Sequence, residues 1–421
     1  MLLIIFGAGE ANGFERKSNN KVKCCHNMGG NMSTNIKKNI FFPNLNGVRF
    51  IAAMMVVVHH IEQIKGWYGY SSLYKDNIYG TNLGGLGVAL FFVLSGFLIT
   101  YLLLVEKRDS GTICIKDFYI RRILRIWPLY FLIVVLAFII IPVFFKSIVI
   151  ANFLTMLNVD YYKKLAMYVF FIPNIALISS YPVLFASQAW SVGVEEQFYA
   201  IWPLLVKLFK KPIIIMTIIV IFYLIINLLF DNLISKTGGR GSKFFIYREF
   251  FLITRIDCMA IGGMCATISL KKNKFYEIIT NKIMQLIVYL IAIVLIYHEF
   301  PFKGLGHLPY AALFGIIIIN LATNDGTILR LKNSVFEYGG KISYGIYMFH
   351  GLGIILSFLL YKRLNVKFGM IGTNLALYGV SIGLTLLLSA ISYQFYEKYF
   401  LVKKIKFSSI VSGDNVSQSK E

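Results

Sequence analysis

Two kinds of ionisable residue lie in an apolar segment near the N-terminus. Residues 45–60 read Leu-Asn-Gly-Val-Arg-Phe-Ile-Ala-Ala-Met-Met-Val-Val-Val-His-His, with Arg49 near one end and His60 at the other. At about 100° per residue, eleven residues return to nearly the same helix face, roughly 16 Å further along the axis. A charged group in a membrane-length segment normally faces the interior of a helix bundle and marks a functional path. We therefore expect the chemistry on this face.

Three arginines in residues 121–125 form the second group. Arg122 and Arg125 are spaced i and i+3, so they share one helix face, and Arg121 precedes them. Guanidinium groups bind phosphate through two parallel hydrogen bonds, whereas lysine acts as a point charge. The alternative is that these arginines only anchor a helix at the lipid headgroups. The residues leave the two readings about equally supported.

Carboxylates and a histidine occur in three further segments. Glu195 and Glu196 open an apolar run and are followed by Tyr199, and a buried carboxylate needs a cationic partner. Glutamates at a helix start also complement the helix dipole without any other role. The next candidates are Arg255 and Asp257, which neutralise each other or pair elsewhere in the bundle. The last is His350, for which the alternative is a core histidine with no role in a site.

The composition shows what kind of scaffold positions these groups. Of the 421 residues, 57% are hydrophobic and only 15% are charged, and the mean hydropathy is +0.68. Soluble domains carry about a quarter charged residues. Because the apolar runs are continuous and of spanning length, the sequence predicts an all-α, polytopic transmembrane helical bundle rather than a barrel. We expect about ten spans, at residues 45–64, 84–105, 123–145, 192–208, 212–230, 249–270, 283–297, 308–322, 343–360 and 375–396.

The net charge of +22 follows from how Lys and Arg are distributed among the loops. With the N-terminus in the cytoplasm, the inside segments carry 27 of the 42 basic residues and the outside loops 13. This bias predicts a multi-pass protein of the cell membrane with both termini cytoplasmic. It makes a nucleic-acid partner unnecessary, and we expect none. Residues 166–180 are apolar but interrupted by Pro173, so we interpret them as a re-entrant or interfacial segment.

The remaining features predict little chemistry. The five cysteines have neither metal-ligand spacing nor a disulfide pattern, so we expect no metal. Residues 1–40 are polar and basic, and we expect a disordered N-terminal leader there. The membrane domain is expected over residues 41–401, followed by a cytoplasmic tail over residues 402–421. The sequence leaves the oligomeric state open.

Taken in order, these segments resemble the bacterial integral-membrane acyltransferases of acyltransferase family three. The resemblance covers residues 41–401, and each of its motifs is weak alone but the ordered set is specific. One departure concerns Asn46, where the family commonly has an aspartate; an asparagine there cannot serve as a charge partner of Arg49. The motifs occupy residues 45–60, 91–99, 121–126, 190–199, 255–257, 341–350 and 393–397.

The resemblance implies transfer of an acyl group, usually acetyl from acetyl-CoA or another acyl-CoA, to a hydroxyl of a cell-surface polysaccharide or other glycan. The family's essential histidine falls on His60, which would be the general base, a role that suits imidazole near neutral pH. Its glutamate motif falls on Glu195 and Glu196. Its arginine motif falls on Arg122 and Arg125, which would bind the donor at the inner face with Arg121 beside them. Supporting positions are Arg49, Arg255, Asp257, Tyr199 and His350.

Two questions stay open at this stage. On the predicted topology His60 lies toward the outer leaflet and the arginines toward the inner one, so either the pantetheine arm of the donor enters the bundle or an acyl group is relayed. The alternative function is a transporter or a lipid or glycan flippase, whose charges would line a translocation path. Repeated halves would favour that alternative, and the sequence shows none.

Overall fold

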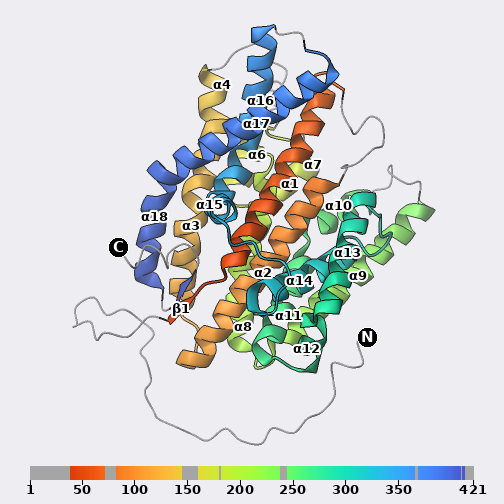
Figure 1. Cartoon of the computed structure of the whole chain (residues 1–421), viewed down its shortest axis with the longest axis vertical. Helices are drawn as coiled ribbons and strands as arrows, with labels where there is room; N and C mark the ends of the chain where they lie inside the picture. Colours follow the sequence, from red (N-terminus) through yellow and green to blue (C-terminus); the bar gives the residue numbers. More distant parts are fainter. Residues whose placement is uncertain are drawn as a thin grey trace, which may run out of the picture.

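The computed structural model describes residues 38–71, 82–144, 160–179, 182–237, 244–365, 368–408 and 410–412. These residues form a helical bundle with one pair of three-residue strands (Figure 1). The helices of the first half are α1 (Pro43–Trp67), α2 (Leu83–Ser110), α3 (Ile115–Val135), η2 (Leu136–Ile140), α4 (Ile141–Phe144), α6 (Tyr161–Val169), α7 (Pro173–Ser179), α8 (Ala189–Leu208) and α9 (Pro212–Lys236). Those of the second half are α10 (Phe244–Thr254), α11 (Ile256–Lys271), α12 (Lys274–Thr280), α13 (Lys282–His298), α14 (Leu308–Thr323), α15 (Ser334–Lys341), α16 (Ser343–Leu364), α17 (Met370–Ser392), η4 (Tyr393–Glu397), α18 (Lys398–Lys404) and η5 (Ile405–Phe407).

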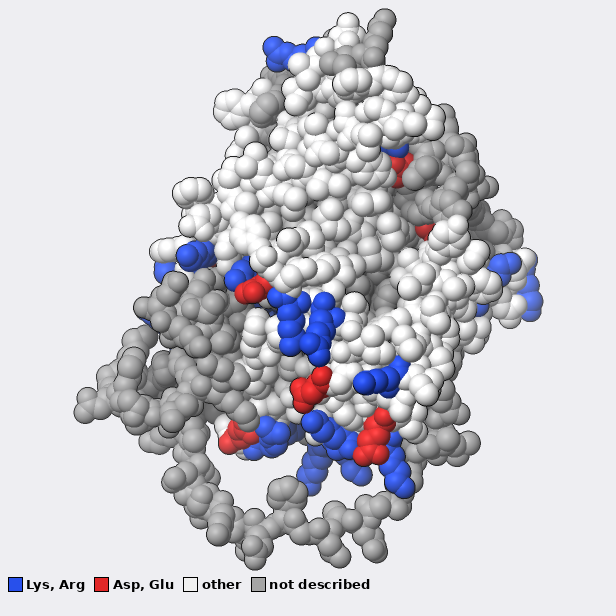
Figure 2. All heavy atoms as spheres, in the orientation of Figure 1, with Lys and Arg blue, Asp and Glu red and all other residues white. Residues whose placement is uncertain are grey.

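Each of the ten predicted spans falls on helical segments, with α10 and α11 sharing the span at residues 249–270, so the helical membrane bundle is confirmed. Seven helical stretches among the described residues are long and apolar enough to cross a membrane. An eighth results if α12 and α13, which meet at an angle of 64°, count as one span. The helix at the predicted span 192–208, α8, is not among these stretches, and the predicted span at α14 is a shorter apolar helix of 16 residues. On the face drawn in Figure 2, basic side chains gather mainly below a broad uncharged band, as a membrane protein requires.

The segment around Pro173 does not cross the bundle. It folds into α6 and α7, of nine and seven residues, which are too short to span a membrane. Phe171 turns the chain between them with a φ of 56°, and its ring stacks on Tyr130 of α3 at 4.5 Å. Its carbonyl accepts a hydrogen bond of 2.9 Å from Gln197 of α8. The non-helical backbone is thus satisfied by neighbouring protein, as expected for a non-spanning segment.

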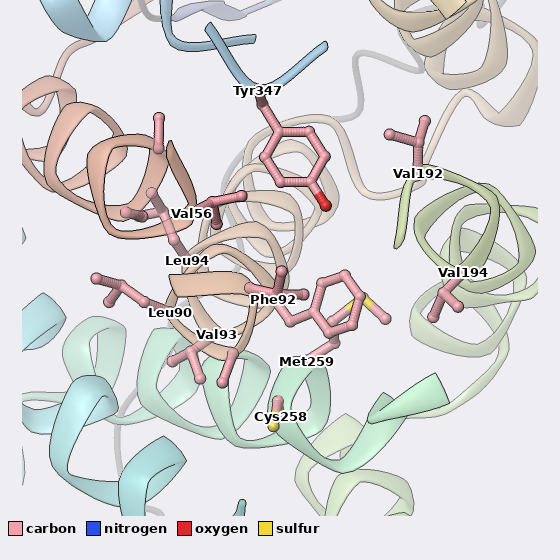
Figure 3. Close-up of a cluster of buried hydrophobic side chains, with 14 of the residues drawn as sticks. Val56, Leu90, Phe92, Val93, Leu94, Val192, Val194, Cys258, Met259 and Tyr347 are labelled. Atoms are coloured by element: carbon pink, nitrogen blue, oxygen red, sulfur yellow. The ribbon is translucent and has the colours of Figure 1, made fainter. Parts of the chain in front are cut away.

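The centre of the bundle depends on two helices that approach each other unusually closely. A Cβ added to Gly96 of α2 would lie 2.0 Å from the carbonyl oxygen of Met259, and one added to Gly262 of α11 would lie 2.0 Å from that of Val93. Glycines at both points allow the two backbones to touch, which is the usual way for helices to pack in a membrane. Figure 3 shows the apolar side chains beside this contact, among them Val93 and Met259, with Tyr347 of α16 above them.

The two ends of the described chain meet at one end of the bundle. Strand β1 (Lys38–Ile40) runs directly into α1, and strand β2 (Ile410–Ser412) follows α18 and η5. The two strands pair in parallel, with Lys38 opposite Ile410. In Figure 1, β1 lies near the lower end of α18, at the opposite end of α1 from Trp67. Residues 1–37 of the predicted leader lie outside the described residues.

Candidate active site

A pocket of about 150 Å³ lies in the bundle between α1, α2, α3, α8 and α16. Three of its cationic groups come from the predicted motifs: Arg49 from α1, and Arg122 and Arg125 from α3. Glu195 of α8 lines the same pocket and is its one carboxylate among the described residues. Tyr199 of α8 lines it as well, so helices that are far apart in sequence bring together five of the predicted site residues. The excess of positive charge suits an anionic ligand.

Arg49 keeps a partner although the expected aspartate is absent. Its Nη1 donates a hydrogen bond of 2.8 Å to the Oδ1 of Asn46, one turn earlier on α1. An amide oxygen accepts this bond as a carboxylate would, but it does not cancel the charge of the guanidinium. Asn46 thus orients Arg49 and leaves the pocket more positive than an aspartate would.

Arg122 is held among aromatic rings. Its guanidinium carbon lies 5.5 Å from the ring centre of Phe118 and 5.7 Å from that of Tyr199, distances typical of cation–π contacts. Its Nε is buried and has no hydrogen-bond partner among the residues that the structure describes. A buried donor without a partner is costly, so a ligand that accepts from this atom would be favoured.

Tyr199 lies beside Arg122 and on the same face of α8 as Glu195. Its hydroxyl lies 2.5 Å from that of Ser95, and either oxygen can donate this hydrogen bond. Glu195 and Tyr199 are four residues apart on the helix, so they share one face, and both line the pocket. Ser95 falls inside the motif at residues 91–99, but nothing in its local sequence distinguishes it from other serines.

The two neighbouring glutamates have different surroundings. Glu196 accepts a hydrogen bond of 3.0 Å from the indole nitrogen of Trp127, and it does not line the pocket. Consecutive residues on a helix point about 100° apart, so only one of the two can face the pocket fully. Among the predicted glutamates, Glu195 is therefore the one placed for chemistry.

Arg121 also lies away from the pocket. Its guanidinium forms an ion pair of 3.3 Å with Glu106 of α2 and donates a bond of 2.8 Å to the carbonyl of Phe407. These contacts fasten α3 to α2 and to the C-terminal segment. The structure thus separates Arg121 from Arg122 and Arg125, with which the sequence had grouped it.

His60 lies beside a second histidine rather than in the pocket lining. The ring centres of His60 and His350 are 4.7 Å apart, and that of His350 is 5.9 Å from that of Tyr347, which does line the pocket. The Nδ1 atoms of His60 and His350 lie 2.8 and 2.7 Å from the carbonyl oxygens of Val56 and Tyr347. Because a carbonyl only accepts, both Nδ1 atoms carry the proton in these bonds, and Nε2 of each neutral ring is the basic atom.

Arg255 and Asp257 occupy another part of the bundle. Arg255 stands at the break between α10 and α11, with a φ of 42°, and donates hydrogen bonds to the carbonyls of Leu252 and Gly85. Its guanidinium carbon lies 5.9 Å from the ring centre of Trp190. Asp257 is buried, and neither residue lines the pocket. The described residues contain no cluster of three or more groups that would hold a metal ion.

A family model described as an acyltransferase domain matches residues 42–394 of this chain. The chain belongs to acyltransferase family three. The ordered motifs of the sequence are therefore those of a family of acyltransferases, and the resemblance that they indicated is confirmed.

Curated relatives of the family-three chain carry related names. This chain is 24% identical to the peptidoglycan O-acetyltransferase OatA of Listeria monocytogenes over 74% of its own length and 49% of the relative. It is 26% identical to an O-acetyltransferase, provisionally so named, of Staphylococcus aureus strain COL over 89% of this chain and 59% of the relative. For YrhL of Bacillus subtilis, provisionally named a peptidoglycan O-acetyltransferase, the identity is 24%, over 85% of this chain and 54% of the relative. The chain spans about half the length of these relatives, and no solved structure matches it.

Proposed function

We propose that this family-three protein transfers an acetyl group from acetyl-CoA to a hydroxyl of a cell-wall glycan, with peptidoglycan as the acceptor. The carrying observation is the pocket that joins Arg49, Arg122 and Arg125 and adjoins the His60–His350 pair through Tyr347. An anion site and a base are the two things that acyl transfer from a phosphorylated donor to an alcohol requires. The names of the relatives support peptidoglycan as the acceptor.

In this proposal the arginine pocket holds the phosphates of the donor. Arg122 and Arg125 are one turn apart on α3, so their planar forks reach adjacent oxygens of a diphosphate. The pantetheine arm then extends past Tyr347 toward the histidines, about three turns of α1 beyond Arg49. The arginine pocket and the histidines therefore lie along one path of the donor, and no acyl relay is needed to connect them.

At the far end of this path His60 is the general base. Its Nε2 takes the proton of the acceptor hydroxyl while that oxygen attacks the thioester carbonyl carbon. The carbon–sulfur bond then breaks, and the departing thiolate of CoA takes the proton back from the imidazolium. Hydrogen bonding of Nδ1 to the Val56 carbonyl fixes the tautomer that this step needs. Glu195, which lines the pocket together with Tyr199, would bind a polar group of the substrates.

A transfer assay tests this function. Membranes from cells with and without the protein are incubated with acetyl-CoA radiolabelled in the acetyl group, and the peptidoglycan is then purified and counted. We expect alkali-labile label in the peptidoglycan only when the protein is present, because an ester of a sugar hydroxyl is cleaved by base. Absence of label from every glycan fraction, with the protein well expressed, would contradict the proposal.

We also propose that both termini lie in the cytoplasm and that the donor enters from there. The bias of basic residues supports this orientation, and the pocket wall includes Ile40 of β1, at the end of the bundle where β1 and β2 pair. The glycan would then approach His60 from the outer side. The proposed location is accordingly the cell membrane.

Single cysteines in a Cys-free variant test the orientation. Ser179 at the end of α7 and Lys210 after α8 are both exposed. In the proposed orientation, Ser179 lies on the outer side of the membrane and Lys210 on the cytoplasmic side. On intact cells, a membrane-impermeant thiol reagent should label a cysteine at Ser179 and leave one at Lys210 unlabelled until the cells are opened. Labelling of Lys210→Cys on intact cells would invert the proposed orientation of α8.

A further inference from the structure

A fourth cation lines the arginine pocket, and it comes from the opposite end of the chain. Lys404 is the last residue of α18, is 8% exposed, and lies in the pocket wall with Arg49, Arg122 and Arg125. From the sequence it is one of five basic residues after position 397, which orientation in the membrane alone would explain. Its burial in the pocket wall is not what such a role requires, because topogenic lysines extend to the aqueous side.

The fold places Lys404 firmly at one end of the pocket. Its carbonyl accepts a hydrogen bond of 3.2 Å from the hydroxyl of Ser408, and Arg121 holds the carbonyl of Phe407 at 2.8 Å. Strand β2 follows and pairs with β1, whose Ile40 also lines the pocket. Lys404 therefore lies at the end of the bundle where β1 and β2 pair, whereas Tyr347 of the same pocket wall lies next to His350.

We infer that Lys404 binds the 3′-phosphate of CoA, while Arg122 and Arg125 bind its diphosphate. The inference rests on the proposed function, since it takes acetyl-CoA as the donor. In CoA the diphosphate lies between the pantetheine arm and the adenosine that carries the 3′-phosphate. When the thioester points toward His60, the adenosine is directed away from the histidines, to the end of the pocket where Lys404 lies.

The side-chain chemistry agrees with this division of the donor. A lysine ammonium is a compact point charge that suits a terminal phosphate monoester, whereas paired guanidinium forks suit the more extended diphosphate. The charged groups of the pocket wall are four cations and one carboxylate. Both phosphate groups of CoA are thereby matched by positive charge, and the 3′-phosphate becomes a point at which the site distinguishes CoA from dephospho-CoA.

Affinities for CoA and dephospho-CoA test the inference on the purified full-length protein in detergent. The wild type should bind CoA on the order of tenfold more tightly, because a hydrogen bond between charged groups is lost with the 3′-phosphate. Lys404→Gln should remove most of this preference by weakening CoA alone, and Lys404→Arg should restore much of it. Lys403→Gln is the matched control, since Lys403 is exposed and donates to the hydroxyl of Tyr399; it should keep the wild-type preference.

Each other result has a definite meaning. Equal binding of the two ligands by the wild type would overturn the role of Lys404 and leave CoA as the donor. Equal weakening of both ligands by Lys404→Gln, or no weakening, would also overturn it. If the wild type bound neither ligand, the proposed donor itself would be wrong. The preference of the wild type is measured without any variant. The inference can therefore be contradicted even if the Lys404→Gln protein misfolds.

Discussion

Replacement of His60 by alanine is expected to abolish transfer of acetyl from acetyl-CoA to the glycan. Without the imidazole, no group in its place takes the hydroxyl proton, and a general base contributes about 10²- to 10⁴-fold to the rate. The loss should appear in the rate at saturating donor, with CoA binding retained, because the arginine pocket does not include His60. The measurement is the initial rate of glycan labelling, together with CoA affinity of the same preparation.

His59→Ala is the matched control for this prediction. The ring of His59 lies 5.0 Å from that of His60 and packs against α2 at Gly84, whereas His60 contacts His350. We therefore expect the His59 variant to retain much of the activity at a normal level of expression. An inactive His59→Ala protein beside an active His60→Ala protein would show that the base is His59 and that its assignment to His60 is wrong.

Arg122→Lys is expected to weaken binding of CoA by on the order of tenfold. The substitution keeps the positive charge but removes the planar fork, and with it one of two parallel bonds to phosphate. It also removes the guanidinium that lies over Phe118 and Tyr199. Equilibrium binding of CoA to the purified protein measures the effect, and thermal stability in detergent shows whether the fold is intact.

The adjacent arginine provides the control for Arg122. Arg121 bonds to Glu106 and to the Phe407 carbonyl outside the pocket, and a lysine preserves the charge of that ion pair. Arg121→Lys should therefore bind CoA as the wild type does. Equal losses in the two variants would mean that the arginines serve insertion or packing, and unchanged affinity in Arg122→Lys would exclude a phosphate fork at this position.

The sequence determined the class of the protein and the approximate place of its helices. Long apolar runs have no stable alternative to helices in lipid, since every backbone polar group must be satisfied within its own segment. The proline at position 173 interrupts one apolar run and predicts a segment that does not span the membrane, and this segment forms the short helices α6 and α7. The family could also be named from the sequence, because its motifs keep their order along the chain and each of them needs only local residues.

Helical periodicity went one step further and no more. It put Arg49 on the face of His60, and Arg122 on the face of Arg125, because residues on one helix repeat every 3.6 positions. It could not say which neighbouring helix covers each face. For that reason the sequence treated Glu195 and Glu196 alike and grouped Arg121 with Arg122, although their contacts differ.

The tertiary structure alone decided which groups share a site. It placed His350 against His60, although 290 positions separate them in the numbering. It gave Arg49 the amide of Asn46 as a partner and brought Lys404 to the arginines. These pairings arise from the packing of helices and from the meeting of β1 with β2. Such contacts depend on the shapes of whole helix faces, including glycines such as Gly262 that let two backbones touch, and no local pattern of residues encodes them.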